Sequence, residues 1–160
     1  MSIIALLQMD ATVGDLNGNA NRLSLLAQQA HDEGATIGVS TELAVCGYPP
    51  RDLLLEQDFI QHSLDVALNI RVPIPLLVGT PIPPQDDRSL PTNGVIRCGP
   101  DVASITADKS SRVVAQKQLL PTYDVFDEAR YFAAENRSGL ARSIGGMTLG
   151  VTVCEDAWQS

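Results

Sequence analysis

Aromatic and basic residues are both scarce in this sequence. Phe, Trp and Tyr make up only 4% of it, which leaves little surface on which single-stranded nucleic acid could stack. Lys and Arg number 11 against 19 Asp and Glu, so the formal net charge is −8. Because phosphate binding requires clustered positive charge, we expect no nucleic-acid partner.

A long hydrophobic segment and a basic leader are also lacking. No stretch approaches the roughly 20 apolar residues that a membrane-spanning helix requires. The first ten residues carry no Lys or Arg ahead of their short apolar run, which indicates a strand rather than a signal peptide. We therefore expect a cytoplasmic protein that does not associate with membranes.

Cysteine is rare as well, and its spacing is not that of a metal site. Cys46, Cys98 and Cys154 are an odd number of cysteines, and no two of them form a CxxC pair. In a chain without an export signal, free thiols are expected rather than disulfides. The sequence also contains no P-loop and no Ser-Gly-Gly pyrophosphate motif. We therefore expect this chain to hold no metal, ATP or other cofactor.

Apolar runs and amphipathic stretches alternate along the chain. A continuous apolar run over residues 3–7 predicts a strand buried on both faces, and residues 36–40 and 76–80 are predicted to form a second, short strand and a third, apolar strand. Apolar residues at helical spacing predict helices over residues 19–31 and 56–70. Antiparallel strands are predicted over residues 93–97, 102–106 and 113–118. This order predicts an α/β domain, with a mixed sheet and helices on one face.

The last apolar run, residues 147–153, predicts a further strand that is entered through Gly145 and Gly146. A strand as apolar as this one is expected in the centre of a sheet, with a neighbour on each edge. Only residues 154–160 follow it. We therefore expect residues 1–160 to form a single incomplete domain that is truncated at its C-terminus.

Two charged residues next to predicted strands are candidates for catalysis. Glu42 follows the strand at 36–40, and a carboxylate in a partly desolvated pocket can act as a general base. On position alone, a structural role for Glu42 as a cap or ion-pair partner is favoured. Lys117 lies within an apolar run, where a fixed cation can stabilise negative charge on a carbonyl oxygen. The more common case is a lysine whose ammonium group reaches solvent.

Cys154 follows the last predicted strand, within Gly150-Val-Thr-Val-Cys-Glu-Asp-Ala-Trp158. A lone cysteine in such a place is usually a small buried hydrophobic residue. Its two acidic neighbours would raise the pKa of the thiol above its ordinary value of about 8.5, so a reactive thiol needs a base or a cation nearby. Glu42 and Lys117 are residues of the right types for these partners.

The order Glu42, Lys117, Cys154, with the sequence around each, resembles the nitrilase (carbon–nitrogen hydrolase) superfamily. Three longer segments resemble the N-terminal glutaminase domain of glutamine-dependent NAD synthetase: Gly47-Tyr-Pro-Pro-Arg-Asp-Leu-Leu54, Lys117-Gln-Leu-Leu-Pro-Thr-Tyr123 and Val125-Phe-Asp-Glu-Ala-Arg-Tyr-Phe132. The opening segment Gln8-Met-Asp-Ala-Thr-Val-Gly-Asp15 fits the same domain. The resemblance covers essentially the whole chain and implies one half of an α-β-β-α sandwich.

The resemblance implies a Glu-Lys-Cys triad that hydrolyses the side-chain amide of glutamine. Cys154 would attack the amide carbon and form a thioester, Glu42 would take the thiol proton and later activate water, and Lys117 would hold the oxyanion. The residues that resemble the family's glutamine-binding residues are Tyr48, Tyr123, Phe126 and Glu155. For the three aromatic rings, ordinary packing is an equal alternative.

The resemblance also implies a larger enzyme around this chain. Ammonia would pass to a separate synthetase domain, absent here, that uses ATP and magnesium to amidate nicotinic acid adenine dinucleotide to NAD. The parent enzyme would be a homo-oligomer, and the chain alone would be weak or inactive. The sequence departs from the family at Ser40-Thr41, where a proline usually precedes the glutamate. It departs again at residues 91–112, which are longer and more irregular than the family's paired strands.

Two other functions compete with this one. The chain could belong to a stand-alone nitrilase-type amidase that acts on another small amide, although the segments at 48–54 and 125–132 favour the synthetase. It could also be a non-catalytic remnant that serves as an interaction module. In either case a central strand without one neighbour would expose an apolar edge, so we expect poor solubility.

Overall fold

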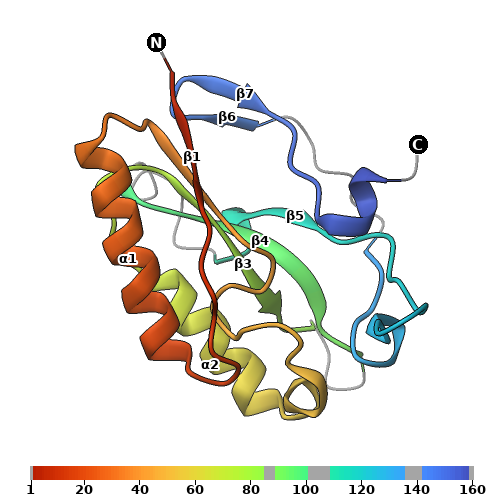
Figure 1. Ribbon diagram of the computed structural model, residues 1–160. Coiled ribbons are helices and arrows are strands. Elements are labelled where there is room, and N and C mark those ends of the chain that lie inside the picture. Colours follow the sequence, from red (N-terminus) through yellow and green to blue (C-terminus); the bar gives the residue numbers. More distant parts are fainter. Residues whose placement is uncertain (1, 85–88, 101–108, 136–141, 159–160) are drawn as a thin grey trace.

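The computed structural model describes residues 2–84, 89–100, 109–135 and 142–158, and its main element is a five-stranded sheet. In spatial order the strands are β1 (Ile4–Leu7), β2 (Ile37–Ser40), β3 (Leu76–Ile82), β4 (Thr92–Cys98) and β5 (Val113–Gln116). The first three strands are parallel, β4 is antiparallel to β3, and β5 is antiparallel to β4. The sheet is therefore mixed, as predicted (Figure 1).

Two helices, α1 (Leu16–Asp32) and α2 (Gln57–Leu68), pack on the same face of this sheet (Figure 1). Helix α1 begins earlier than predicted because the Asp15 side chain accepts the backbone N–H of Gly18 at 3.0 Å and caps its first turn. It ends ahead of Gly34, whose φ of +90° is a conformation that glycine adopts readily. The prediction of helices on one face is confirmed.

The face that α1 and α2 cover, called here the helix face, holds the larger hydrophobic core. Its fully buried side chains come from both helices, from the strands and from the segment after β2, and they include Leu23, Ala27, Ala67, Leu76, Val78, Ile96 and Leu43. Cys46 and Cys98 lie in the same core. Burial of this much apolar surface is the main source of the stability of the domain.

The opposite face, called here the hairpin face, is covered by two short antiparallel strands, β6 (Arg142–Ile144) and β7 (Met147–Leu149), which are blue in Figure 1. The buried residues of this face are Ile37, Leu77 and Ile144. Valines 39, 95 and 151 are partly buried around them. The core on the hairpin face is therefore much smaller than the core on the helix face.

Strand β1 differs from its prediction because it is the edge strand of the sheet. Leu7 is buried on the helix face, but Ile4 and Leu6, which alternate with it, are 44% and 79% exposed. The hairpin packs on residues of β2 and β3 and leaves this side of β1 open. The prediction that residues 3–7 form a strand buried on both faces is therefore wrong.

The prediction of a central strand over residues 147–153 is also wrong. Strand β7 covers only Met147–Leu149 and pairs with β6 alone. Gly145 and Gly146, with φ values of +54° and +76°, turn the chain directly back from β6 into β7. Residues 150–153 then run on outside any strand towards Cys154. Their apolar side chains pack on a sheet rather than within one.

The remaining predicted strands are partly confirmed. Two of the three predicted antiparallel strands, those at residues 93–97 and 113–118, are present as β4 and β5, and these two strands pair with each other. The third, predicted at 102–106, lies outside the described residues. Within the part of the chain that the structure describes, no helix has the length and apolarity needed to cross a membrane.

Candidate active site

Glu42 and Lys117 each follow a strand of the main sheet. Strand β2 ends two residues before Glu42, and β5 ends directly before Lys117. The segment that carries Glu42 crosses β3 closely at Gly79, where a Cβ atom would approach the backbone nitrogen of Leu43 to 2.6 Å. Glycine at this position therefore allows the backbone around Glu42 to lie against β3.

Ser40, two residues before Glu42, connects the end of β2 to β3. Its Oγ accepts the backbone N–H of Gly79 at 3.1 Å and donates to the carbonyl oxygen of Thr41 at 3.0 Å. On the other side of Glu42, Leu43 has a φ of +49°, which is uncommon for a residue with a side chain. The end of this strand is thus held by a side-chain hydrogen bond to the neighbouring strand.

Lys117 is fully buried and lies between two carboxylates. Its Nζ is 2.8 Å from Oε1 of Glu42 and 2.8 Å from Oε2 of Glu128. Burial acts to lower the pKa of Lys117, but the hydrogen bonds to Glu128 and Glu42 outweigh it, and the pKa is raised above its usual value of 10.5. Lys117 therefore remains a cation inside the protein, and its ammonium group does not reach solvent.

Glu128 is the carboxylate that the sequence did not single out as a site residue. It begins the 3₁₀ helix Glu128–Arg130, is buried, and accepts the hydroxyl of Tyr48 at 3.1 Å. Burial raises its pKa, and the hydrogen bond from Lys117 opposes this rise only in part. A signal was available, since a buried ammonium group has three donors and needs more acceptors than Glu42 alone supplies.

Cys154 begins the 3₁₀ helix Cys154–Ala157 and lines the same cavity as Glu42. The cavity measures about 290 Å³ and lies on the hairpin face. Burial raises the pKa of the Cys154 thiol above 9.0, the charge of Glu42 and a hydrogen bond to it raise the pKa further, and Lys117 opposes them. The structure thus brings the three predicted catalytic residues together.

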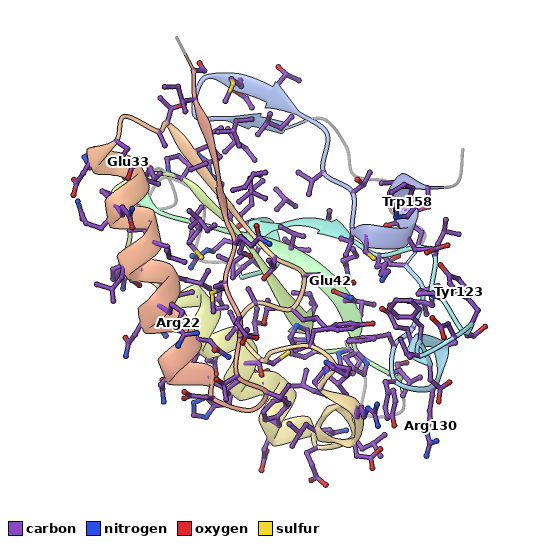
Figure 2. All side chains as sticks on the ribbon, viewed as in Figure 1. Arg22, Glu33, Glu42, Tyr123, Arg130 and Trp158 are labelled. Atoms are coloured by element: carbon purple, nitrogen blue, oxygen red, sulfur yellow. The ribbon has the colours of Figure 1, made fainter. Side chains whose placement is uncertain are left out.

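The four predicted binding residues fall into two groups. The hydroxyl of Tyr123 donates to Oε2 of Glu155 at 2.8 Å, and the ring of Tyr123 meets that of Phe126 edge to face, with centroids 5.7 Å apart. Glu155, directly after Cys154, is buried. Tyr48 instead contacts Glu128, on the far side of Lys117. Figure 2 shows Glu42 inside the fold and Tyr123 at its periphery.

Asp156 joins the Cys154 helix to the segment that follows Lys117. Its Oδ1 accepts the backbone N–H of Gln118 at 3.1 Å and that of Leu119 at 2.8 Å. The segments that carry the nucleophile candidate and the lysine are therefore joined by hydrogen bonds, although they lie far apart in the sequence. The two acidic residues after Cys154 are thus engaged by Tyr123 and by backbone amides.

Asn93 of β4 is a further residue of the site that sequence reasoning missed. It is fully buried, lines the cavity, and donates from Nδ2 to Oε1 of Glu42 at 2.7 Å. A thiol and a carboxylate that line one cavity, with a fixed cation paired to that carboxylate, form a site suited to nucleophilic attack on a carbonyl carbon. Across the described ranges, no group of three or more His, Cys, Asp and Glu side chains is placed to hold a metal ion.

The chain is similar to curated glutamine-dependent NAD(+) synthetases along nearly all of its length. It is 36% identical over 167 residues to that of Synechocystis sp., covering 99% of this chain and 28% of the relative. It is 38% identical over 159 residues to that of Xylella fastidiosa, covering 98% of this chain and 28% of the relative. The chain therefore spans little more than a quarter of the length of these relatives, and no protein-family model matches it.

Solved structures share the fold. The glutamine-dependent NAD+ synthetase from Acinetobacter baumannii matches with a TM-score of 0.76 and 28% identity, over 97% of this chain and 28% of that one. A mutant of the Nesterenkonia AN1 amidase from the nitrilase superfamily matches with a TM-score of 0.72 and 22% identity, over 98% of this chain and 56% of that one. The chain therefore has the nitrilase fold and resembles glutamine-dependent NAD(+) synthetases, as its motifs predicted.

Proposed function

We propose that this chain is the glutamine-hydrolysing part of a glutamine-dependent NAD synthetase. The observation that carries the proposal is the buried Lys117, held 2.8 Å from Glu42 and from Glu128 beside the cavity that Cys154 lines. A buried charge is costly, and this one lies where a cation would stabilise an oxyanion formed by attack of the thiol. Similarity to the synthetases supports glutamine as the substrate.

In the first half of the reaction, Glu42 acts as the general base for Cys154. It takes the thiol proton as Sγ bonds to the side-chain amide carbon of glutamine, and the carbonyl electron pair moves onto oxygen. Lys117 Nζ stabilises this oxyanion, together with a backbone N–H near Cys154. As the tetrahedral species collapses, the C–N bond breaks, the nitrogen takes the proton from Glu42, ammonia leaves, and a thioester remains.

In the second half, water resolves the thioester. Glu42 removes a proton from water as the water oxygen bonds to the acyl carbon, and Lys117 again holds the oxyanion. The C–S bond then breaks, glutamate leaves, and the sulfur of Cys154 recovers its proton from Glu42. The raised pKa of Lys117 keeps it cationic throughout, and the raised pKa of Cys154 keeps the resting thiol protonated until the base acts.

The residues around the nucleophile support recognition of an amino acid. The carboxylate of Glu155 would pair with the ammonium group of glutamine, and the rings of Tyr123 and Phe126, which contact Glu155 and each other, would line the substrate beside it. Tyr48 acts from the other side, where its hydroxyl orients Glu128 against Lys117. Each of these residues would contribute to glutamine affinity.

The proposed reaction needs a consumer for its ammonia. A synthetase domain of the same parent chain would use it with ATP and magnesium to amidate nicotinic acid adenine dinucleotide, and this chain itself would hold no cofactor. The parent would work in the cytoplasm as a homo-oligomer. We expect the chain alone to hydrolyse glutamine weakly, because it spans only 28% of the relatives' length.

Ammonia release from glutamine tests the proposal on the full gene product and on this chain. The full product should release ammonia, and Cys154→Ala should slow this release by about 10⁴-fold or more, since the nucleophile is lost. Cys98→Ala, which removes a buried thiol of the helix face, is the matched control and should keep the rate per folded molecule. Undiminished release by Cys154→Ala would refute the assignment.

A stand-alone amidase is the second candidate, and the fold shared with the Nesterenkonia amidase favours it. The two functions differ in the group attached to the scissile amide. Under the synthetase reading, glutamine should be hydrolysed far faster than acetamide or propionamide, because Glu155 gains an ammonium partner only with glutamine. Equal rates for the three amides would favour the stand-alone amidase.

A further inference from the structure

Asn93 shares a single oxygen of Glu42 with Lys117. Nδ2 of Asn93 lies 2.7 Å from Oε1 of Glu42, and Nζ of Lys117 lies 2.8 Å from the same oxygen. The backbone carbonyl of Asn93 also accepts the backbone N–H of Lys117 at 2.7 Å. One residue of β4 therefore contacts both the candidate base and the candidate oxyanion holder.

The orientation of the Asn93 amide is fixed by the chemistry of its neighbour. A carboxylate can only accept hydrogen bonds, so the atom that faces Glu42 must be the amide nitrogen. Oδ1 of Asn93 is then left buried, with no hydrogen-bond partner among the described residues. An unsatisfied buried acceptor destabilises the folded state, so Asn93 is a poor choice for stability alone.

We propose that Asn93 is a positioning residue that presents Oε2 of Glu42 to the thiol of Cys154. With Oε1 engaged by two donors, Oε2 is the oxygen that remains to take the thiol proton. Asn93 and Lys117 together fix the plane of the carboxylate, because rotation of Glu42 would break both hydrogen bonds. The identity of the substrate rests on the proposed function, whereas activation of the thiol does not.

The groups around Glu42 explain why an uncharged donor is needed. The charged groups that face it are Lys117 and, behind that residue, Glu128, while Tyr48 and the thiol of Cys154 complete the surroundings. A second cation at the position of Asn93 would compete for the oxyanion, and a carboxylate would repel Glu42. An amide donates a hydrogen bond and adds no charge.

Alkylation of Cys154 by iodoacetamide tests the proposal without any use of glutamine. Asn93→Ala should slow the alkylation at pH 8 by about tenfold or more, and should lower kcat for ammonia release by about 10²-fold with KM changed less than about threefold. Thr80→Val is the matched control, because Thr80 lies on the adjacent strand β3, is fully buried, and has an unpartnered Oγ1. It should leave both rates unchanged.

A second variant, Asn93→Asp, separates positioning from packing and decides the matter if Asn93→Ala does not fold. The introduced carboxyl has nearly the same shape but can donate to Glu42 only when it is protonated. The ratio of the variant's alkylation rate to that of wild type should therefore be low at pH 8 and recover as the pH falls. A ratio that does not change with pH, or alkylation within about twofold of wild type in every Asn93 variant that folds, would overturn the proposal.

The two proposals fail in different ways. If wild-type protein releases no ammonia from glutamine while the Asn93 variants still slow alkylation, the assignment of glutamine fails and the role of Asn93 stands. If ammonia is released and the Asn93 variants match wild type in both assays, the role of Asn93 fails and the glutaminase assignment stands.

Discussion

The two faces of the main sheet hold their cysteines in opposite environments. On the helix face, Cys46 and Cys98 are fully buried among apolar side chains and are inert by position. On the hairpin face, Cys154 is exposed and lines a cavity of about 290 Å³ beside Glu42. The difference shows that the element covering each face, rather than the cysteine itself, decides whether the thiol can react.

The two faces also differ in their roles: the helix face provides most of the hydrophobic core, and the hairpin face holds the candidate active site. The helix face is covered by two helices and contains the larger core, whereas the hairpin face has a small core and an open cavity. The cavity region carries the costly features: a buried lysine, and left-handed backbone at Leu43 and Cys154, with φ values of +49° and +45°. We infer that the helix-face core offsets the energetic cost of the site.

Thiol reactivity should show the largest difference between the faces. Burial raises the pKa of Cys46 to about 12 and that of Cys98 to about 11, so at pH 9 only about one Cys46 thiol in a thousand is ionised. Iodoacetamide should therefore modify Cys154 at least about 10²-fold faster than either, as measured by peptide mass spectrometry.

The pH dependence of the same reaction has a definite sign. Because burial and the charge of Glu42 raise the pKa of Cys154 above 9.0, its alkylation rate should still be increasing above pH 9. Glutamine should protect Cys154 and leave the other two thiols unaffected. Equal labelling of all three cysteines would show that the contrast between the faces does not exist.

Removal of the buried cation should have the next largest effect. Lys117→Met leaves Glu42 and Glu128 facing each other without a counter-ion, and loss of one partner of a buried ion pair costs about 3–5 kcal/mol. Urea unfolding should show this loss at pH 7, and should show it shrink as the pH falls and one carboxylate takes a proton.

At high pH, the wild-type protein should itself lose the stability that the charge of Lys117 provides. The pKa of Lys117 is raised in the folded state, so the stability from its charge is complete below pH 10.5 and is lost as the pH rises through the folded-state pKa. Lys117→Met should lack this decline. If Lys117→Met were as stable as wild type at pH 7, the energetic cost of burying the ammonium group would equal the stabilisation from its ion pairs.

Local sequence signals sufficed for the elements whose structure is decided locally. Helix α1 has apolar residues at helical spacing, and β4 and β5 are antiparallel strands as predicted. The burial of β1 and the length of β7 were predicted wrongly, because both depend on which element covers which face. An apolar run looks the same whether it lies inside a sheet or packs on one.

The residues of the candidate site also fall into those that local sequence could indicate and those that it could not. Glu42, Lys117 and Cys154, which the structure brings together, could be proposed from the sequence because each stands beside an apolar run in a motif that resembles a known family. Asn93 and Glu128 were missed because their importance comes from contacts with Glu42, 51 residues away, and with Lys117, 11 residues away. A rule that asks which groups neutralise a buried lysine would have indicated Glu128.

Matched core substitutions should show a smaller effect that still distinguishes the faces. Leu23→Ala, in the helix-face core, should reduce the free energy of unfolding by about 2–5 kcal/mol and leave the alkylation rate of folded Cys154 unchanged. Ile144→Ala, in strand β6 of the hairpin, should reduce the free energy of unfolding by an amount near the lower end of this range, because a two-stranded hairpin can close over the space more easily. Since β7 leads through residues 150–153 to Cys154, only Ile144→Ala should also change the alkylation rate. If both variants altered that rate equally, stability and chemistry would not be divided between the faces.

The smallest effect is expected at the uncovered corner of the hairpin face. Leu6 is 79% exposed on the edge strand β1, and Leu6→Thr keeps a residue suited to a strand, so the free energy of unfolding should change by less than about 0.5 kcal/mol. The solubility of the chain should rise, because an exposed apolar side chain is removed from an unpaired sheet edge. The control is Leu7→Thr. The Leu7 side chain is buried in the core of the helix face, so this substitution should clearly reduce the free energy of unfolding. If Leu6→Thr and Leu7→Thr reduced the free energy of unfolding by comparable amounts, the hairpin face would be covered over β1 as well. The contrast between the two faces would then be limited to the cavity.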